Sequence, residues 1–270
     1  MDIQYKNLVY KSREIEHLYG DNIHILANPV LQTTLAQFCS NEVALPQINQ
    51  QLLELYQFLI DETLNLEFEK EVIKIDTRMK SLSEQGYFEG DVLSAKSKAV
   101  VISLARAGII PSHVCFERLH SFLSAEGLRQ DHFYINRKVN DQNEVIGVDI
   151  SGSKVGGEQE GAYVLLPDPM GATGGSISYV VNHYKNQVHG KAKKYIALHL
   201  IVTPEYILRM QKEHPDLVII ALRLDRGLSS ERALNTIPGT YPEEEKGLTE
   251  TQYIVPGAGG VGEILNNSFV

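Results

Sequence analysis

The stretch Val164-Leu-Leu-Pro-Asp-Pro-Met-Gly-Ala-Thr-Gly-Gly-Ser176 decides the fold of this chain. The apolar run from Ala162 to Leu166 predicts a short buried strand. Asp168 follows it, and then a loop of small residues leads into a helix. Four apolar residues of that helix recur at the spacing of one amphipathic face: Ile177, Val180, Val181 and Tyr184.

This strand–turn–helix unit predicts a phosphate site. Glycines allow a backbone to approach a ligand closely, and the N-terminus of a helix presents free N–H groups to anions. A carboxylate just before such a turn suits the hydroxyls of a sugar phosphate. The alternative is a connection that binds nothing, which a two-glycine turn alone would favour. Because Asp168, Thr173 and Ser176 all stand in register with the turn, we expect phosphate binding.

Composition excludes several classes of protein. The net charge of −9 argues against a nucleic-acid partner, because phosphate backbones require a basic face. No apolar stretch approaches the roughly 20 residues of a membrane helix, and the N-terminus lacks the layout of a signal peptide. Cys39 and Cys115 form no CxxC pair. We therefore expect a cytoplasmic protein with reduced thiols, no zinc knuckle and no membrane contact.

Buried strands alternate with amphipathic helices along the chain, which predicts an α/β fold with a parallel sheet flanked by helices. Such sheets bind ligands at the carboxyl ends of their strands, where Arg106 and Asp168 are expected. The predicted strands are residues 99–105, 132–136, 162–166, 195–202 and 217–222, and the predicted helices are residues 45–60, one beginning near Ser112, and one capped by Thr203.

We expect a single domain with four parts. Residues 1–95 form an N-terminal helical extension, residues 96–225 the α/β core, and residues 251–270 a C-terminal loop. Between the last two lies the segment 226–250, which is polar, rich in turns and long for a connection. We interpret it as an ordered surface insertion.

The C-terminal segment Gly257-Ala-Gly-Gly-Val-Gly262 matches the pattern GxGxxG. A dinucleotide site is not expected here, because that fingerprint needs a following helix, a second strand and an acid about 20 residues later. Only the residues from Glu263 to Val270 follow. Two interpretations remain: a glycine-rich loop without a ligand, or a loop whose backbone groups bind the edge of a flat polar ring.

Several segments together resemble one family. Asp168-Pro-Met-Gly-Ala-Thr-Gly-Gly-Ser176 closely resembles the phosphoribosyl-pyrophosphate (PRPP) loop of uracil phosphoribosyltransferases, departing from it at Gly171, where the family usually has Leu. Tyr253-Ile-Val-Pro-Gly-Ala-Gly-Gly-Val-Gly-Glu263 is similar to the family's C-terminal uracil loop. There Gly260 replaces an acid, and Glu263 replaces a later Asp. Leu104–Gly108 and Tyr134–Arg137 resemble two further family segments.

The resemblance implies a type I phosphoribosyltransferase fold with a C-terminal hood that receives the base. It implies transfer of the phosphoribosyl group from PRPP to uracil, giving UMP and pyrophosphate, with Mg²⁺ as cofactor and a homo-oligomeric enzyme. Arg106 and Arg137 would meet the pyrophosphate, and both would be catalytic together with Asp168. The residues implied to hold PRPP are also Pro169, Met170, Gly171, Ala172, Thr173, Gly174, Gly175, Ser176 and Gly260; those implied to contact uracil are Ile254, Gly259, Gly260 and Val261.

Three alternatives stay open. A phosphoribosyltransferase for another base would keep Asp168 and Arg106 and alter the C-terminal loop, as Gly260 does. A regulator that binds PRPP or a nucleotide would use the same loop without turnover. A nicotinamide-dependent enzyme would use the GxGxxG segment. The histidines show no metal-binding spacing, and Cys115 is interpreted as a buried core thiol.

Overall fold

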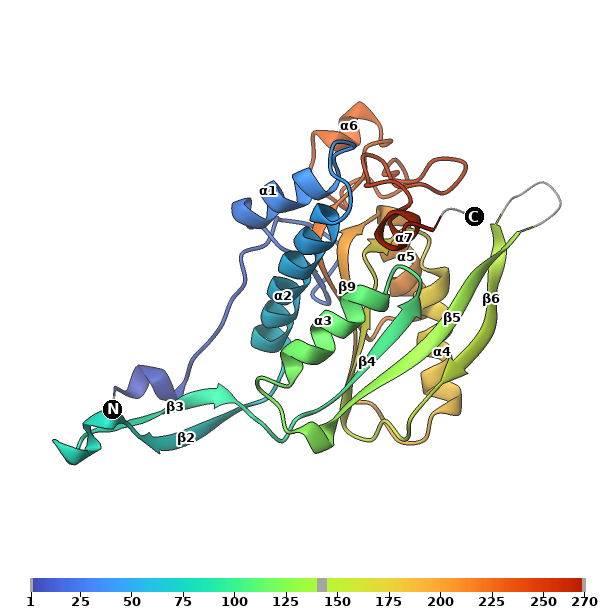
Figure 1. Cartoon of the computed structure of the whole chain (residues 1–270). Helices are drawn as coiled ribbons and strands as arrows, with labels where there is room; N and C mark the ends of the chain where they lie inside the picture. The colour runs from blue at the N-terminus through green and yellow to red at the C-terminus, as the bar shows by residue number, and fades with distance from the viewer. Residues whose placement is uncertain (1, 140–144, 269–270) are drawn as a thin grey trace.

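A central sheet organises the chain (Figure 1). The computed structural model describes residues 2–139 and 145–268, and for residues 136–139 and 145–150 it describes the backbone alone. All neighbouring strands of the sheet run parallel except β6, which is antiparallel to β5 at one edge. Its order is β1 (Ile23–Ile25), β10 (Leu217–Leu224), β9 (Lys194–Val202), β7 (Ala162–Pro167), β4 (Lys98–Ala105), β5 (Leu128–Val139) and β6 (Val145–Lys154), and the short β8 (Met170–Gly171) pairs with β9.

Helices cover both faces of the sheet, so the predicted α/β fold is confirmed (Figure 1). On one face lie α1 (Pro29–Phe38), α2 (Gln47–Glu67) and α3 (Ile109–Leu119). On the other lie α4 (Gly175–Gln187) and α5 (Pro204–Glu213). Because both faces are covered, the central strands are apolar along their whole length rather than alternating.

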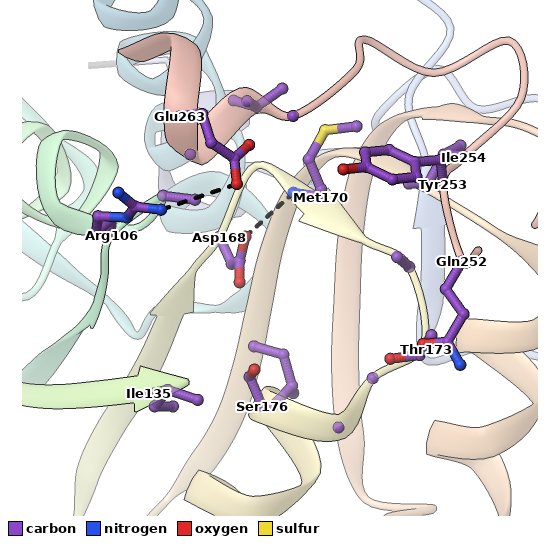
Figure 2. Close-up of a pocket in the computed structure, with 18 of the residues that line it drawn as sticks. Arg106, Ile135, Asp168, Met170, Thr173, Ser176, Gln252, Tyr253, Ile254 and Glu263 are labelled. Carbon is purple, nitrogen blue, oxygen red and sulfur yellow. Dashed lines mark hydrogen bonds and ion pairs between the residues drawn. The ribbon is translucent and has the colours of Figure 1, made fainter. Parts of the chain in front are cut away.

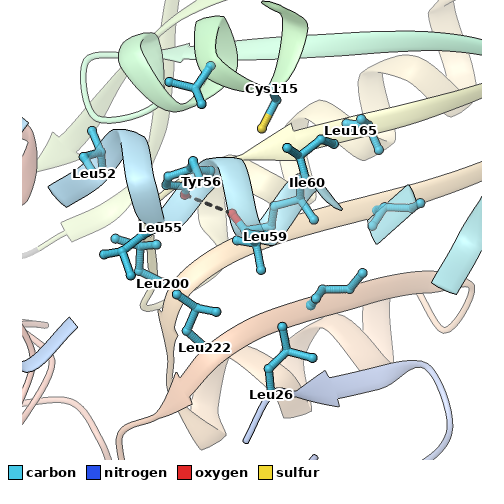
Figure 3. Packing of buried hydrophobic residues seen from close by; sticks show 14 of the residues in the cluster. Leu26, Leu52, Leu55, Tyr56, Leu59, Ile60, Cys115, Leu165, Leu200 and Leu222 are labelled. Atoms are coloured by element: carbon cyan, nitrogen blue, oxygen red, sulfur yellow. Dashed lines mark hydrogen bonds between the residues drawn. The ribbon is translucent and has the colours of Figure 1, made fainter. Parts of the chain in front are cut away.

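The two apolar layers divide the residues of each strand between them. In β4, Ala99 and Val101 face the α2 side, and Val100 and Ile102 face the α4 side. The α2 layer is the larger of the two, and Figure 3 shows its centre, where Tyr56 lies among leucines and isoleucines. The Tyr56 hydroxyl is buried and donates a hydrogen bond to the carbonyl of Leu198, 3.2 Å away. The one polar atom of that side chain is therefore hydrogen-bonded to the sheet.

Some boundaries differ from those predicted. Helix α2 begins after Pro46, which stands at its N-cap, and runs on to Glu67. Helix α3 begins at Ile109 rather than near Ser112, because the chain turns directly from Arg106 into the helix. Strand β5 is longer than the predicted 132–136, since β6 pairs with it where it extends beyond the parallel sheet.

The first 95 residues are not wholly helical, which corrects the expected helical extension. Strand β1 joins the edge of the main sheet. After α2, strands β2 (Lys70–Asp76) and β3 (Tyr87–Leu93) form an antiparallel hairpin, joined through the 3₁₀ turn η2 (Arg78–Ser81), that projects from the body (Figure 1). Polar and apolar residues alternate in this half-exposed hairpin, so no continuous apolar run predicts its strands. The 3₁₀ turn η1 (Ile3–Lys6) packs on β3.

The segment 226–250 has defined structure and lies against the N-terminal region. It contains the short helix α6 (Glu231–Leu234). The amide of Leu18 donates to the carbonyl of Pro238, 2.8 Å away, and so joins the two regions. The remaining elements are the 3₁₀ turn η3 (Ala125–Gly127) and the C-terminal helix α7 (Val261–Asn266). Among the helices that the structure describes, none is long and apolar enough to cross a membrane.

Candidate active site

Asp168 is held at the carboxyl end of β7 by contacts through its backbone. Its amide donates to the carbonyl of Leu198, 3.0 Å away, and its carbonyl accepts a hydrogen bond from Nδ1 of His199 at 2.6 Å. One carboxylate oxygen, Oδ1, accepts the amide of Met170 at 3.2 Å (Figure 2). The side chain is thereby oriented at the start of the predicted phosphate loop.

His199 is fully buried, and burial lowers its pKa from 6.5 to about 4. It is therefore neutral at physiological pH, and because Nδ1 donates to Asp168, Nε2 is the acceptor for the Tyr206 hydroxyl at 2.7 Å. This hydrogen-bonded pair was not predicted from the sequence. His199 lies inside an apolar strand, where a histidine is expected to be a buried core residue. Tyr206 lies on the next helix.

The glycine-rich turn is built around Gly174. This residue has φ of 77°, the left-handed region that favours glycine, and it is the N-cap of α4. A Cβ there would lie 2.6 Å from Cε of Met210, so the turn also needs the missing side chain for space. Arg209 donates to the carbonyl of Thr173 at 3.0 Å. The free N–H groups of the first turn of α4 thus open into the pocket that Gly175 and Ser176 line.

Arg106 directly follows β4 and reaches the C-terminal segment. Its Nη1 donates to the carbonyl and the hydroxyl of Ser268, at 2.9 and 2.8 Å. Its Nη2 lies 3.8 Å from Oε1 of Glu263, as Figure 2 shows. The guanidinium is about one-third exposed, so it faces the pocket rather than a sealed core.

A buried ion pair between Arg223 and Asp225 holds the C-terminal loop, and it was not predicted from the sequence. Asp225, the first residue after β10, accepts the amide of Gly257 at 2.7 Å. Arg223 binds the same carboxylate through two N–H groups, at 2.6 and 2.8 Å. The carboxylate is almost fully buried. Its place at the carboxyl end of a parallel strand was the available signal.

These elements enclose one pocket of about 820 Å³ at the carboxyl ends of β4, β5 and β7. The structure brings together most of the predicted site residues there: Arg106, Asp168, Met170, Ala172, Thr173, Gly174, Gly175, Ser176, Ile254, Gly259, Gly260 and Val261. Figure 2 shows Tyr253 and Ile254 of the C-terminal loop on the side of the pocket opposite to Arg106. The phosphate loop and the C-terminal loop therefore face the same space.

Of the predicted residues whose side chains the structure describes, Pro169 and Gly171 do not line this pocket. Pro169 carries a carbonyl that accepts the amides of Leu200 and Ile201, at 3.0 and 3.1 Å, so its backbone is part of the sheet. Gly171 is turned away, toward Tyr206. Arg137 lies in β5, but its side chain lies outside the described residues.

Other pocket residues were not predicted. Glu263 is the most consequential of them, because it adds a second carboxylate to the pocket beside Asp168. Further lining residues without a predicted role are Ala105, Ala107, Tyr134, Ile135, Ser151, Ile177, Tyr206, Gln252, Tyr253 and Gly262.

The pocket fits a hard cation that a substrate brings with it. Asp168 and Glu263 supply carboxylate oxygens, which are ligands that Mg²⁺ prefers. Within residues 2–139 and 145–268, no cluster of three or more acidic, histidine or cysteine side chains forms a metal cage. Mg²⁺ usually keeps several waters and binds through one or two carboxylates and substrate phosphates, so such a sparse donor set suits it.

Comparison with known proteins gives a consistent result. A family model described as uracil phosphoribosyltransferase matches residues 25–240. A uracil phosphoribosyltransferase from Variovorax paradoxus (strain S110) is 26% identical over 210 residues, which cover 77% of this chain and 90% of that protein. One from Polaromonas naphthalenivorans (strain CJ2) is 25% identical over 243 residues, covering 90% and 96%.

The fold has a relative among solved structures. The AQ2163 protein from Aquifex aeolicus superposes with a TM-score of 0.67 at 20% sequence identity, covering 90% of this chain and 97% of that one. At this identity the likeness concerns the fold alone.

Proposed function

The chain belongs to the uracil phosphoribosyltransferase family and is a pentosyl-transferring enzyme; from this premise we propose that its base is uracil. The reaction is then uracil plus PRPP giving UMP and pyrophosphate, a step of pyrimidine salvage. The family match ends at residue 240, before the C-terminal loop. The identity of the base therefore depends on that loop and is the part that needs an experiment.

PRPP binds across the phosphate loop in this proposal. The N–H groups of Thr173 to Ser176 and the N-terminus of α4 receive the 5-phosphate, because they offer donors and a positive dipole end. Asp168 accepts hydrogen bonds from the ribose hydroxyls. Arg106 and Arg137 bind the pyrophosphate, for which a guanidinium provides both charge and paired donors.

Uracil binds under the C-terminal loop. Ile254, Gly259, Gly260 and Val261 line the pocket there, and their backbone groups can bind the polar edge of the ring. Gly257 N–H is already engaged by Asp225, so the loop is fixed before the base arrives. A fixed set of backbone donors and acceptors distinguishes bases by the pattern on their edges.

The mechanism that we propose is dissociative. The bond between C1 of the ribose and the pyrophosphate oxygen stretches, the sugar gains oxocarbenium character, and the leaving group gains negative charge. Arg106 stabilises that charge, Asp168 holds the ribose, and the C-terminal loop keeps the ring nitrogen in line with C1. Mg²⁺, when bound, neutralises part of the pyrophosphate charge. We assign no general base.

One observation carries this proposal: the phosphate loop, Arg106 and the C-terminal loop line a single pocket. The test is the rate of UMP formation from PRPP, Mg²⁺ and uracil by the purified protein and by Asp168→Asn. We expect turnover by the wild type and a loss of about 10- to 100-fold in kcat/KM for the variant, the equivalent of 1.5–3 kcal/mol of charged hydrogen bonding.

A second candidate is transfer to another base. The observation that favours it is Gly260, which stands in the base-facing loop where the family has an acid. A nucleotide other than UMP in the same assay would select this candidate. PRPP binding with thermal stabilisation but no turnover would instead select a regulator.

A further inference from the structure

The side chain of Glu263 is folded back over Gly260, the residue that precedes α7. A Cβ placed on Gly260 would overlap Oε2 of Glu263 and lie 3.1 Å from its Cδ. Gly260 has φ of −79° and ψ of 72°, close to the inverse γ-turn conformation that other residues also adopt. Glycine at this position therefore leaves open the space that the Glu263 carboxylate fills.

This carboxylate lies at the end of the pocket where the pyrophosphate is expected. Its Oε1 is 3.8 Å from Nη2 of Arg106 (Figure 2), and the side chain is about one-third exposed. Asp168 lines the same pocket. A pyrophosphate that binds Arg106 therefore comes close to the carboxylate of Glu263.

The Glu263 carboxylate and a bound pyrophosphate are both negative, so they repel each other unless a cation lies between them. The protein as a whole has a net charge of −9, so its overall field does not relieve this repulsion. Mg²⁺ bound to PRPP would relieve it, because this ion takes one or two carboxylates in addition to phosphate oxygens.

Resting on the proposed function, we propose that Glu263 receives the magnesium ion of the Mg²⁺–PRPP complex, directly or through a coordinated water. Gly260 is glycine because a side chain there would displace this carboxylate. The two residues act as a unit: the acid is supplied from the first turn of α7, and the preceding position is left open for it.

A purely structural role for Glu263 makes a different prediction. A glutamate in the first turn of a helix stabilises the helix N-terminus, and glutamine at the third position serves almost as well in a capping box. Glu263→Gln therefore keeps the size and the hydrogen-bonding atoms of the side chain and removes its charge. A change in magnesium dependence is then a readout that capping would not move.

The experiment is a calorimetric titration of each protein with PRPP, once with Mg²⁺ and once with EDTA. The variants are Glu263→Gln, Gly260→Ala and the double variant, with Glu250→Gln as the control that removes one exposed acid outside the pocket lining. We expect Mg²⁺ to tighten PRPP binding to the wild type and to the control. Each single variant loses about 10-fold of that gain, and the double variant loses no more than either single one.

Three results would overturn the inference or its premise. If Glu263→Gln keeps the full magnesium-dependent gain, Glu263 does not meet the ion. If it binds PRPP more tightly than the wild type in the presence of Mg²⁺ as well as in EDTA, Glu263 only opposes the pyrophosphate or competes for Arg106. If the wild type does not bind PRPP at all, the proposed function fails first. Gly260→Ala guards against a folding defect, because the overlapping atom is the far end of a flexible side chain that can move.

Discussion

At the scale of single residues, a chain of buried hydrogen bonds ends at Asp168. The Tyr206 hydroxyl donates to Nε2 of His199, and Nδ1 of His199 donates to the Asp168 carbonyl. Both side chains are fully buried, so a broken link would leave an unpaired polar group in the core. Their role is to position the residue that we propose to bind ribose, not to touch the substrate's reacting atoms.

This arrangement predicts a specific loss of stability in acid. Burial lowers the pKa of His199 from 6.5 to about 4, so the unfolded chain binds a proton more readily between these values. The stability contribution is complete above pH 6.5 and falls as the pH drops toward 4. Urea unfolding at pH 7.5 and pH 5 should show that His199→Gln loses about 2 kcal/mol less than the wild type. Equal losses in the two proteins would contradict the assignment.

Gly171 has a packing reason to depart from the family's leucine. A Cβ at this position would lie 2.9 Å from Cγ1 of Val202, 3.2 Å from Cδ1 of Tyr206 and 3.3 Å from Cγ of His199. The Tyr206–His199 pair thus occupies the space that a side chain at 171 would need. The sequence showed the departure but not its cause, because Gly171 lies in β8 and Tyr206 lies on α5.

The corresponding variant is Gly171→Ala. We expect it to lower the free energy of unfolding by about 1–3 kcal/mol, the usual cost of overpacking. Combining it with Val202→Ala should cost less than the sum of the two single changes, because the nearest clashing atom is removed. Denaturant unfolding of all four proteins measures this coupling. A neutral or stabilising Gly171→Ala would show that the loop has room to spare.

At the scale of elements, the N-caps of α5 and α1 allow an effect on stability to be distinguished from an effect on PRPP binding. Thr203 accepts the amide of Tyr206 at the start of α5, and its hydroxyl also donates to the Ala172 carbonyl in the phosphate loop, 2.8 Å away. Asn28 caps α1 in the same way, accepting the amide of Val30 at 3.0 Å, but α1 contributes no residue to the pocket.

Thr203→Ala and Asn28→Ala should each lower the free energy of unfolding by about 1 kcal/mol, because each removes one cap. Only Thr203→Ala should also weaken PRPP binding, since it releases the Ala172 carbonyl. Denaturant unfolding and PRPP titration of both variants provide the comparison. Equal PRPP affinities would mean that Thr203 supports the helix and not the loop.

The elements of the core were predictable from sequence because the strands β4, β7, β9 and β10 are apolar throughout and the helices repeat at 3.6 residues. The hairpin β2–β3 was not predictable in this way. Its residues, such as Val72 and Ile75, are about half exposed, so no continuous apolar run marks it. Strand β1 has three residues and takes its structure from pairing with β10.

At the scale of the whole molecule, a buried ion pair lies inside the insertion, and one of its two partners also binds the N-terminal region. Arg226 contacts Glu245 at 2.9 Å and donates to the carbonyls of Ala233 and Thr236, at 2.8 and 2.6 Å. Glu245 is fully buried and also accepts the hydroxyl of Tyr19 from the N-terminal region. The segment 226–250 is thus stabilised by a buried ion pair and by hydrogen bonds to its own backbone.

Arg226→Ala should therefore lower the free energy of unfolding by about 3–5 kcal/mol, because it leaves the Glu245 carboxylate buried without its partner. Arg232→Ala is the matched control. It breaks an exposed pair with Glu244 in the same segment and should lower the free energy of unfolding far less than Arg226→Ala does. Denaturant unfolding measures both. Similar small losses would mean that the insertion contributes little to the stability of the whole.

The candidate site was predictable where one short stretch carries it, and not where distant elements meet. The phosphate loop and Arg106 could be identified because each directly follows an apolar strand. Asp225, His199 and Glu263 became apparent only when the fold brought them to the pocket or beneath it. Three expectations stay predictions: the role of Arg137, the oligomeric state and the cellular compartment.

Competition among nucleobases shows most directly whether this enzyme transfers the phosphoribosyl group to uracil. The purified protein is incubated with PRPP, Mg²⁺ and an equimolar mixture of uracil and the other nucleobases, and the nucleotides are identified by mass spectrometry. We expect UMP as the product, in an amount that matches the pyrophosphate released. Another nucleotide in place of UMP, or intact PRPP with no nucleotide at all, would contradict it.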